Sequence, residues 1–138
     1  MVTIAPDDSA SAVISDKYVP IKAGTDAAFA LGMCKVMIDE GLYHEDFVIA
    51  QTDLPLLVNA QTRRFIRGND IDSHAPEDQF YWWDSKTDML VLAPRNTLDP
   101  GAIKPALEGT WELTALDGST IAVTTVWELM RKRLQDDT

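Results

Sequence analysis

Hydrophobic residues follow two different patterns along this chain, one before and one after about residue 58. In the first part, short runs rich in β-branched and aromatic residues at 2–5 and 18–21 predict strands, and Pro20 suits the edge or end of a strand. A longer apolar stretch at 26–40 predicts a helix. Strands that alternate with helices indicate an α/β unit.

The predicted helix at 26–40 is apolar on nearly every side. Lys35 is the only charged residue between 27 and 38, whereas a helix on a protein surface normally has one polar face. Gly41 supplies the left-handed residue that often ends a helix, and Leu42 is the apolar residue that often follows it. Such a helix needs cover around most of its circumference, and few strands are nearby. The pattern therefore indicates part of a larger fold.

After residue 58 the apolar residues form short alternating runs. They predict strands at 63–67, 79–83, 89–93, 110–116 and 119–124. Asp117-Gly118 predicts a two-residue hairpin turn between the last two strands. Clusters of turn-forming residues predict loops at 69–77 and 94–109.

Two further helices are predicted. A short one at 45–50 has acidic residues in its first turn, where the helix dipole favours them. The other follows Thr125, whose spacing from Glu128 matches a capping box. The chain therefore ends in a helix after its β-rich part.

The composition of the chain limits the kinds of partner that it could bind. The chain has 138 residues, the length of one domain, and a formal net charge of −10. An acidic chain is unsuited to nucleic acid or to an anionic membrane surface. No apolar run has the length of a transmembrane segment, and the N-terminus lacks the features of a signal peptide. We therefore expect no nucleic-acid partner and no transmembrane segment in this chain.

Side chains that could carry chemistry are few. His44 suits a helix cap, His74 lies in a polar loop, and Cys34 is predicted to be a small buried residue, so no metal site is expected. No serine lies in a nucleophile elbow, and no phosphate-binding glycine motif occurs, so no catalytic residue is assigned. The aromatic run at 80–83 alternates between two strand faces, which favours a structural role over a ligand platform.

The segment Lys22-Ala23-Gly24-Thr25-Asp26 is the best candidate for a binding site. Gly24 lets another molecule approach the backbone, and Thr25 can cap the first free N–H groups of the helix. Asp26 places a carboxylate at the positive end of the helix dipole, where it can accept paired N–H donors such as those of guanine. The alternative for this segment is an ordinary helix cap.

Several segments in order carry a resemblance. They are Val2–Asp7, Tyr18–Ala28, Glu40–Val48 and Gln51–Val58, followed more loosely by Phe80–Asp84 and Thr124–Leu129. Together they resemble part of the catalytic subunit of molybdopterin oxidoreductases of the dimethyl sulfoxide reductase family. The nearest subgroup contains nitrate, selenate and perchlorate reductases and ethylbenzene and dimethyl sulfide dehydrogenases. The resemblance covers most of this chain but a small part of such a subunit.

The resemblance implies a partial dinucleotide-binding-like (Rossmann-like) α/β unit at 1–58. A β-rich hairpin region that ends in a helix follows at 59–138, packed on the same domain. In the family this domain holds one of two molybdopterin guanine dinucleotides that chelate molybdenum. The ligand would lie beyond the carboxyl ends of the strands.

The resemblance also implies the residues that bind the cofactor. Asp26 matches the acid that grips guanine, and Gly24 and Thr25 match its neighbours. Pro6 and Asp7 would lie beside them at the same sheet edge. The chain has Ala23 where many relatives have proline, and Ala5-Pro6-Asp7 where other branches have Asp-Pro-Arg, which loosens the match and leaves the role of Asp7 open. The iron–sulfur cysteines and the metal-ligating residue lie outside this chain.

The implied partners are the remainder of the catalytic subunit and an iron–sulfur electron-transfer subunit. The parent enzyme would reduce an oxyanion or oxidise a small organic substrate, at the periplasmic side or at the cytoplasmic membrane. The isolated chain is expected to be inactive, to bind no cofactor, and either to self-associate or to be only marginally stable. Two alternatives are a freestanding acidic protein-interaction module and a small guanine-nucleotide-binding regulator.

Overall fold

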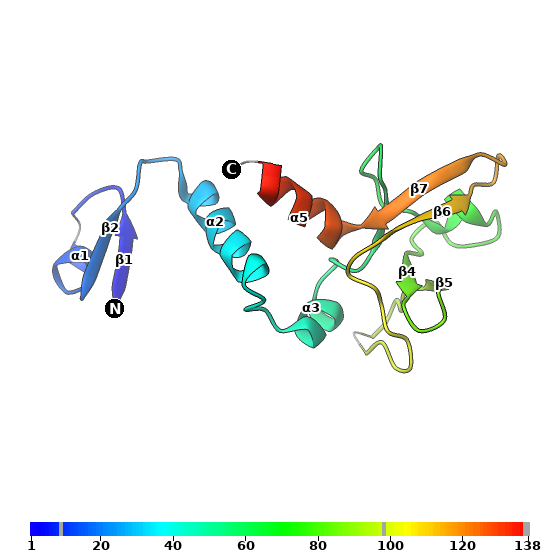
Figure 1. Cartoon of the computed structure of the whole chain (residues 1–138), viewed down its shortest axis with the longest axis horizontal. Helices are drawn as coiled ribbons and strands as arrows, with labels where there is room; N and C mark the ends of the chain where they lie inside the picture. The colour runs from blue at the N-terminus through cyan, green and yellow to red at the C-terminus, as the bar shows by residue number, and fades with distance from the viewer. Residues whose placement is uncertain (9, 98, 137–138) are drawn as a thin grey trace. The chain divides into compact units, whose positions relative to one another are not determined.

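The computed structural model describes residues 1–8, 10–97 and 99–136. The chain divides into two compact units, Met1–Leu42 and Tyr43–Thr138 (Figure 1). Helices and small sheets occur in both, which confirms a mixed α/β class. The predicted domain boundary at residue 58 concerns a larger protein and stays a prediction.

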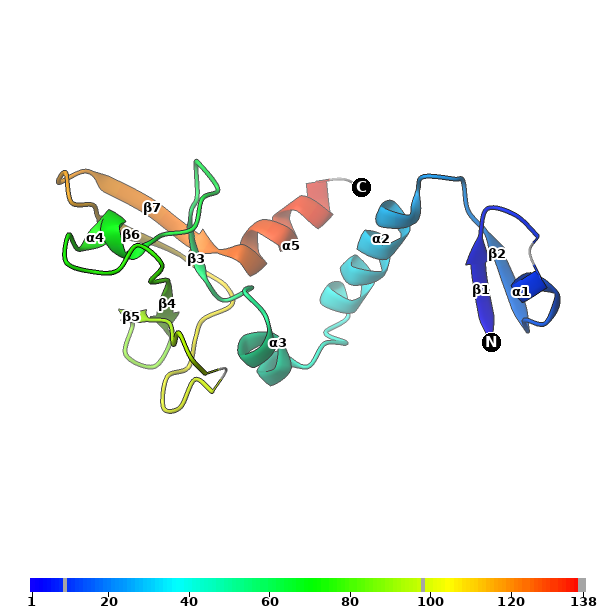
Figure 2. The same ribbon diagram turned by 180° about the vertical axis from the view of Figure 1, so that it is seen from behind.

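Unit 1 begins with two parallel strands. β1 (Val2–Ala5) lies beside β2 (Lys17–Pro20), with Val2 opposite Lys17 and Ala5 opposite Pro20. Parallel strands cannot be joined by a tight hairpin, and the helix α1 (Ala10–Val13) lies in the crossover between them (Figure 2). The two predicted strands and the position of Pro20 at a strand end are confirmed.

The apolar helix α2 (Asp26–Asp39) follows β2 and ends as predicted. Gly41 has φ +65°, and its N–H donates to Ile38 at 3.1 Å, while the N–H of Leu42 donates to Met37 at 2.7 Å. This pair of bonds is a Schellman motif. No residue of α2 is buried, so the described part of the chain does not supply the cover that the apolar pattern demands.

Unit 2 combines three helices with five strands among its described residues. In chain order they are α3 (Glu45–Gln51), β3 (Leu57–Asn59), α4 (Gly68–Ile71), β4 (Tyr81–Asp84), β5 (Met89–Leu92), β6 (Thr110–Thr114), β7 (Thr120–Thr125) and α5 (Val126–Asp136). β7 is the central strand of an antiparallel sheet between β3 and β6, and β4 and β5 form a hairpin. The predicted β-rich region and C-terminal helix are confirmed.

The core of unit 2 lies between these two small sheets. Leu57, Tyr81 and Val123 are buried in one cluster. Burying a side chain such as Leu57 or Val123 contributes about 1.5–3 kcal/mol. Trp83 shares the strand face of Tyr81 and stacks on Trp111, with ring centroids 4.8 Å apart. The alternation predicted for the aromatic run is therefore confirmed, and its inner face packs in the core.

The strand predicted at 63–67 is wrong. Phe65 and Arg67 make only single bridges, to Val58 and to Phe80. The first residue of the predicted strand belongs to a turn, since residue 63 has φ +59°, in the left-handed region. After the turn the N–H of Asn59 donates to the carbonyl of residue 64 at 2.8 Å, and the chain then changes partner from β3 to Phe80, so no continuous strand forms.

Two smaller predictions also need correction. The hairpin turn at Asp117-Gly118 has three residues rather than two, since the N–H of Ala115 donates to Ser119 across it. Gly118 has φ +80°, which is typical of a three-residue turn with a bulge. The loop predicted at 69–77 contains most of α4 instead of irregular chain alone.

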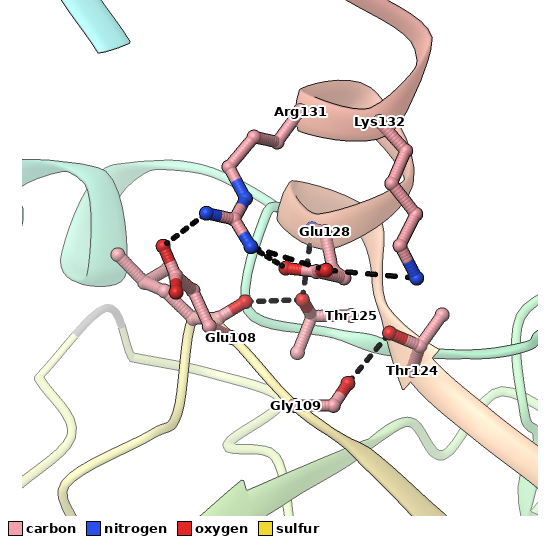
Figure 3. A network of polar contacts seen from close by, with 8 residues as sticks. Glu108, Gly109, Thr124, Thr125, Glu128, Arg131 and Lys132 are labelled. Carbon is pink, nitrogen blue, oxygen red and sulfur yellow. Dashed lines mark hydrogen bonds and ion pairs between the residues drawn. The ribbon is translucent and has the colours of Figure 1, made fainter. Parts of the chain in front are cut away.

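The start of α5 is held by a network of polar contacts (Figure 3). The hydroxyl of Thr125 accepts from the N–H of Glu128 at 3.1 Å and donates to the carbonyl of Leu107. The first half of the predicted capping box is therefore confirmed. The second half is absent, because the Glu128 carboxylate pairs with Arg131 and Lys132 instead of the Thr125 N–H.

Asp84, at the end of β4, ties the hairpin to the following loop. Its buried carboxylate accepts from the N–H groups of Lys86 and Lys104, both at 3.1 Å, and from the Thr87 hydroxyl at 2.9 Å. The Lys86 N–H is the largest influence that lowers the pKa of Asp84, and burial opposes it. The folded state therefore favours the charged carboxylate.

Asp84→Asn is expected to lower the melting temperature at pH 7. Because the pKa of Asp84 is lower when folded, its contribution is full above the unfolded value of about 3.9 and is lost as pH falls through the folded value. The difference between variant and wild type should therefore narrow below about pH 4. Thermal unfolding of both proteins, followed by circular dichroism at pH 7 and at pH 3, measures this difference in melting temperature. A difference that is equal at both pH values would contradict this account.

Candidate functional site

The candidate site is the edge of unit 1 at the carboxyl ends of β1 and β2. Because the strands are parallel, the residues that follow each of them emerge at the same edge (Figure 1). Pro6 and Asp7 follow β1, and the segment 21–26 follows β2. The N–H of Ile21 donates to the carbonyl of Ala5 at 3.2 Å, which continues the pairing up to the edge.

Gly24 forms the turn that leads into α2. Its φ is +84°, a left-handed conformation that side chains rarely adopt. No atom lies within 4 Å of the position that a Cβ would take. Glycine is therefore required here by backbone conformation, and open space surrounds it.

Thr25 does not cap the helix, which corrects the prediction. Its hydroxyl donates to the carbonyl of Lys22 at 2.6 Å and makes no cap hydrogen bond. The reason lies in its backbone, since φ −103° and ψ 11° differ from the extended conformation usual for capping side chains. The hydroxyl stabilises the preceding turn instead of the first N–H groups of α2.

Asp26 is the first residue of α2 and is exposed. Its carboxylate has no hydrogen bond or ion pair with any residue that the structure describes. The dipole of the helix favours a negative charge at this end. Asp26 therefore offers two free acceptor oxygens at the same edge as Pro6, Asp7 and Gly24.

The remaining candidates have structural or surface positions. His44 is the N-cap of α3, where its Nδ1 accepts from the Phe47 N–H at 3.3 Å, as predicted. His74 lies in an exposed loop beside Asp72, and its backbone N–H lowers the pKa of that carboxyl. Cys34 is exposed on α2, so its predicted burial is wrong. Within residues 1–8, 10–97 and 99–136, no group of three or more His, Cys, Asp or Glu side chains could hold a metal ion.

One charged cluster was not singled out from the sequence. Arg63, Arg64 and Arg67 line a cavity in unit 2 together with Asp70. Three arginines within five residues of an acidic chain are a usable signal for this cluster, although the pattern of the segment predicts a strand. None of the helices in the described residues has the length and apolar character needed to cross a membrane.

Comparison with known proteins relates the whole chain to one class of enzyme subunit, although no family model matches it. It is 35% identical to perchlorate reductase subunit alpha of Dechloromonas aromatica, over 99% of this chain and 18% of that protein. It is 38% identical to dimethylsulfide dehydrogenase subunit alpha of Rhodovulum sulfidophilum, over 95% of this chain and 14% of that protein.

Chlorate reductase subunit alpha of Ideonella dechloratans is 36% identical, over 97% of this chain and 15% of that protein. The chain thus spans less than a fifth of the length of these relatives. Similarity along nearly all of this chain, to several such subunits, is more specific than a shared motif. The chain belongs to the dimethyl sulfoxide reductase family of molybdopterin oxidoreductases, and it matches one segment of their catalytic subunits.

Proposed function

We propose that the carboxyl edge of β1 and β2 binds part of a molybdopterin guanine dinucleotide, within a Rossmann-like domain of a larger catalytic subunit. The parallel pairing of the two strands is the observation that carries this proposal. It brings the segment at Pro6 and Asp7 to the same edge as the segment at 22–26. Open α/β sheets bind nucleotides beyond the carboxyl ends of their strands.

The donor and acceptor groups at this edge suit a guanine base. The Asp26 carboxylate has two unpaired oxygens, which match the adjacent ring and amino N–H donors of guanine. Gly24 leaves its backbone open to close approach by a ligand. The hydrogen bond from the Thr25 hydroxyl to the Lys22 carbonyl stabilises the turn that contains Gly24. Pro6 and Asp7 would form the opposite side of the approach. These residues bind and orient the ligand, and the molybdenum that it carries supplies the redox chemistry.

The complete protein would be an oxidoreductase that reduces an oxyanion or oxidises a small organic substrate. The relatives are named as perchlorate, chlorate and nitrate reductases and as a dimethylsulfide dehydrogenase, which supports these two kinds of reaction. Their designation as alpha subunits supports assembly with an electron-transfer partner, here an iron–sulfur subunit. Residues 1–58 would belong to the cofactor-binding domain and 59–138 to its β-rich extension. The 138-residue chain alone would be inactive.

Asp26→Ala in the complete catalytic subunit is expected to reduce the guanine nucleotide that co-purifies with the protein. A hydrogen bond to a charged group contributes about 1.5–3 kcal/mol, so losing two should weaken binding at least about 100-fold. Nucleotide released by acid hydrolysis can be measured by chromatography, and molybdenum by mass spectrometry.

Asp39→Ala is the matched control, because it removes the same charge from the other end of α2. Among the residues that the structure describes, Asp39 pairs only with Lys35, at 3.6 Å, and such an exposed helical pair contributes a few tenths of a kcal/mol. The control should keep the wild-type nucleotide content. Equal content in Asp26→Ala and wild type would remove Asp26 from the proposed site.

A further inference from the structure

A cavity in unit 2 gathers positive charge in an otherwise acidic chain. It has a volume of about 540 Å³, and we name it the arginine pocket after its lining residues Arg63, Arg64 and Arg67. Asp70 is the one acidic residue in its lining, and Phe65 and Ile121 contribute apolar walls. Three cations against one carboxylate contrast with the formal net charge of −10 for the whole chain.

These arginines have no carboxylate partner among the residues that the structure describes. Arg95 and Arg131, by contrast, form ion pairs elsewhere in unit 2. The Asp70 carboxylate lies nearby but accepts from the backbone N–H of Arg67 at 2.7 Å. All three side chains are exposed, and their like charges around one cavity would attract an anion to it.

Contacts around the arginine pocket position the side chain of Arg67 and the backbone of the turn that precedes it, whereas the side chains of Arg63 and Arg64 are exposed. The guanidinium of Arg67 lies over the ring of Phe80 at 4.9 Å, and Phe80 meets Phe65 edge-on, with centroids 5.5 Å apart. The turn before them is fixed by Asn59, whose carbonyl accepts from the Arg63 N–H at 2.9 Å. A donor that is already positioned, as Arg67 is, loses less conformational entropy when a ligand binds.

We propose that the arginine pocket binds a small organic anion with two or more phosphate or carboxylate groups. The planar fork of a guanidinium matches the oxygens of either group with two parallel hydrogen bonds. The cavity volume falls within the range of small-molecule sites, and the walls at Phe65 and Ile121 suit a carbon skeleton. This inference rests on unit 2 alone and is independent of the site proposed in unit 1.

A neighbouring cavity extends the same positive region. It has a volume of about 600 Å³ between α5 and the sheet, and it is lined by Arg63, Lys132 and Arg133 together with Asp136. Arg63 thus lines both cavities. Lys132 is paired with Glu128 at 3.6 Å, so Arg63 is the cation that links the two cavities. The attraction of anions to such a surface falls as salt is added.

Titration calorimetry of the full chain with pyrophosphate and with citrate tests the proposal. Both probes carry about three negative charges near neutral pH, so a difference between them distinguishes phosphate from carboxylate ligands. We expect saturable binding of at least one probe at low salt. Arg64→Ala and Arg67→Ala should each weaken it about tenfold. Arg95→Ala is the matched control and should leave it unchanged, because Arg95 is an exposed arginine outside the pocket.

Arg64→Ala keeps the test valid if Arg67→Ala unfolds the chain, since Arg64 is exposed and makes no ring contact that the structure records. Circular dichroism shows whether each variant is folded. The absence of saturable binding of both probes would overturn the proposal, as would equal binding by wild type and Arg64→Ala. Tight binding of a glutamate-rich peptide together with no binding of either probe would also overturn it and indicate a protein partner.

Discussion

Gly68→Ala is expected to destabilise unit 2 by about 3 kcal/mol, near the upper end of the usual cost of overpacking. A Cβ at this position would lie 2.1 Å from the carbonyl oxygen of Pro76 and 2.9 Å from the Cβ of Ala75. The backbone at Gly68 cannot shift freely away from this contact, because its N–H donates to the carbonyl of Gln79 at 2.8 Å. Urea unfolding followed by tryptophan fluorescence gives the change in the free energy of unfolding.

Gly32→Ala is the control for this substitution. No atom lies within 4 Å of a Cβ built on Gly32, which is in the interior of α2. Alanine is the better helix former by about 0.5–1 kcal/mol, so this change should be neutral or stabilising. If Gly68→Ala unfolds at the same urea concentration as wild type, Pro76 does not pack against Gly68 as described.

The isolated chain is expected to self-associate through α2. Met33, Val36 and Met37 are 45–51% exposed, and they line an apolar surface with Phe29. Water penalises such a surface, and a second copy of the chain could cover it. Sedimentation velocity over a range of protein concentrations should show a shift from monomer to larger species.

The double variant Met33→Lys, Met37→Lys should remain monomeric where the wild type associates. Burying a methionine contributes about 1.5–3 kcal/mol, so losing both should weaken association at least about 100-fold. Met89→Lys is the control, because Met89 is 61% exposed but lies on β5. A wild-type chain that stays a single monomeric species and unfolds cooperatively would contradict this expectation.

Features set by neighbouring residues were predictable from the sequence. The end of α2 at Gly41 depends on one left-handed residue and two local hydrogen bonds, and it lies where the pattern placed it. The cap at Thr25 was harder, because its hydroxyl can reach either an N–H ahead of it or the carbonyl behind it. The backbone angles of the residue decide between them, and composition does not reveal those angles.

Features that join distant segments were not predictable from pattern alone. The segment at 63–67 has the composition of a strand, but it begins in a turn and then makes single bridges to two different segments, at Val58 and at Phe80. The edge that unites Asp7 with Asp26 depends on the direction of β2 beside β1, which periodicity does not specify. The arginine pocket also needs Ile121 of β7 to line the same cavity as Arg67, which depends on how the chain folds. Family resemblance supplied the candidate residues of unit 1, and it offered none for unit 2.

The pairing of β3 with β7 has a consequence for biosynthesis. Leu57 lies opposite Thr125, so the two strands come from near opposite ends of unit 2. A ribosome adds roughly 5–20 residues per second, so several seconds pass between the synthesis of β3 and the synthesis of its partner strand β7. During that time Leu57 and Val58 cannot pair with β7, and their apolar side chains lack the cover of the complete sheet. We therefore expect nascent chains at this stage to bind chaperones that recognise apolar strands.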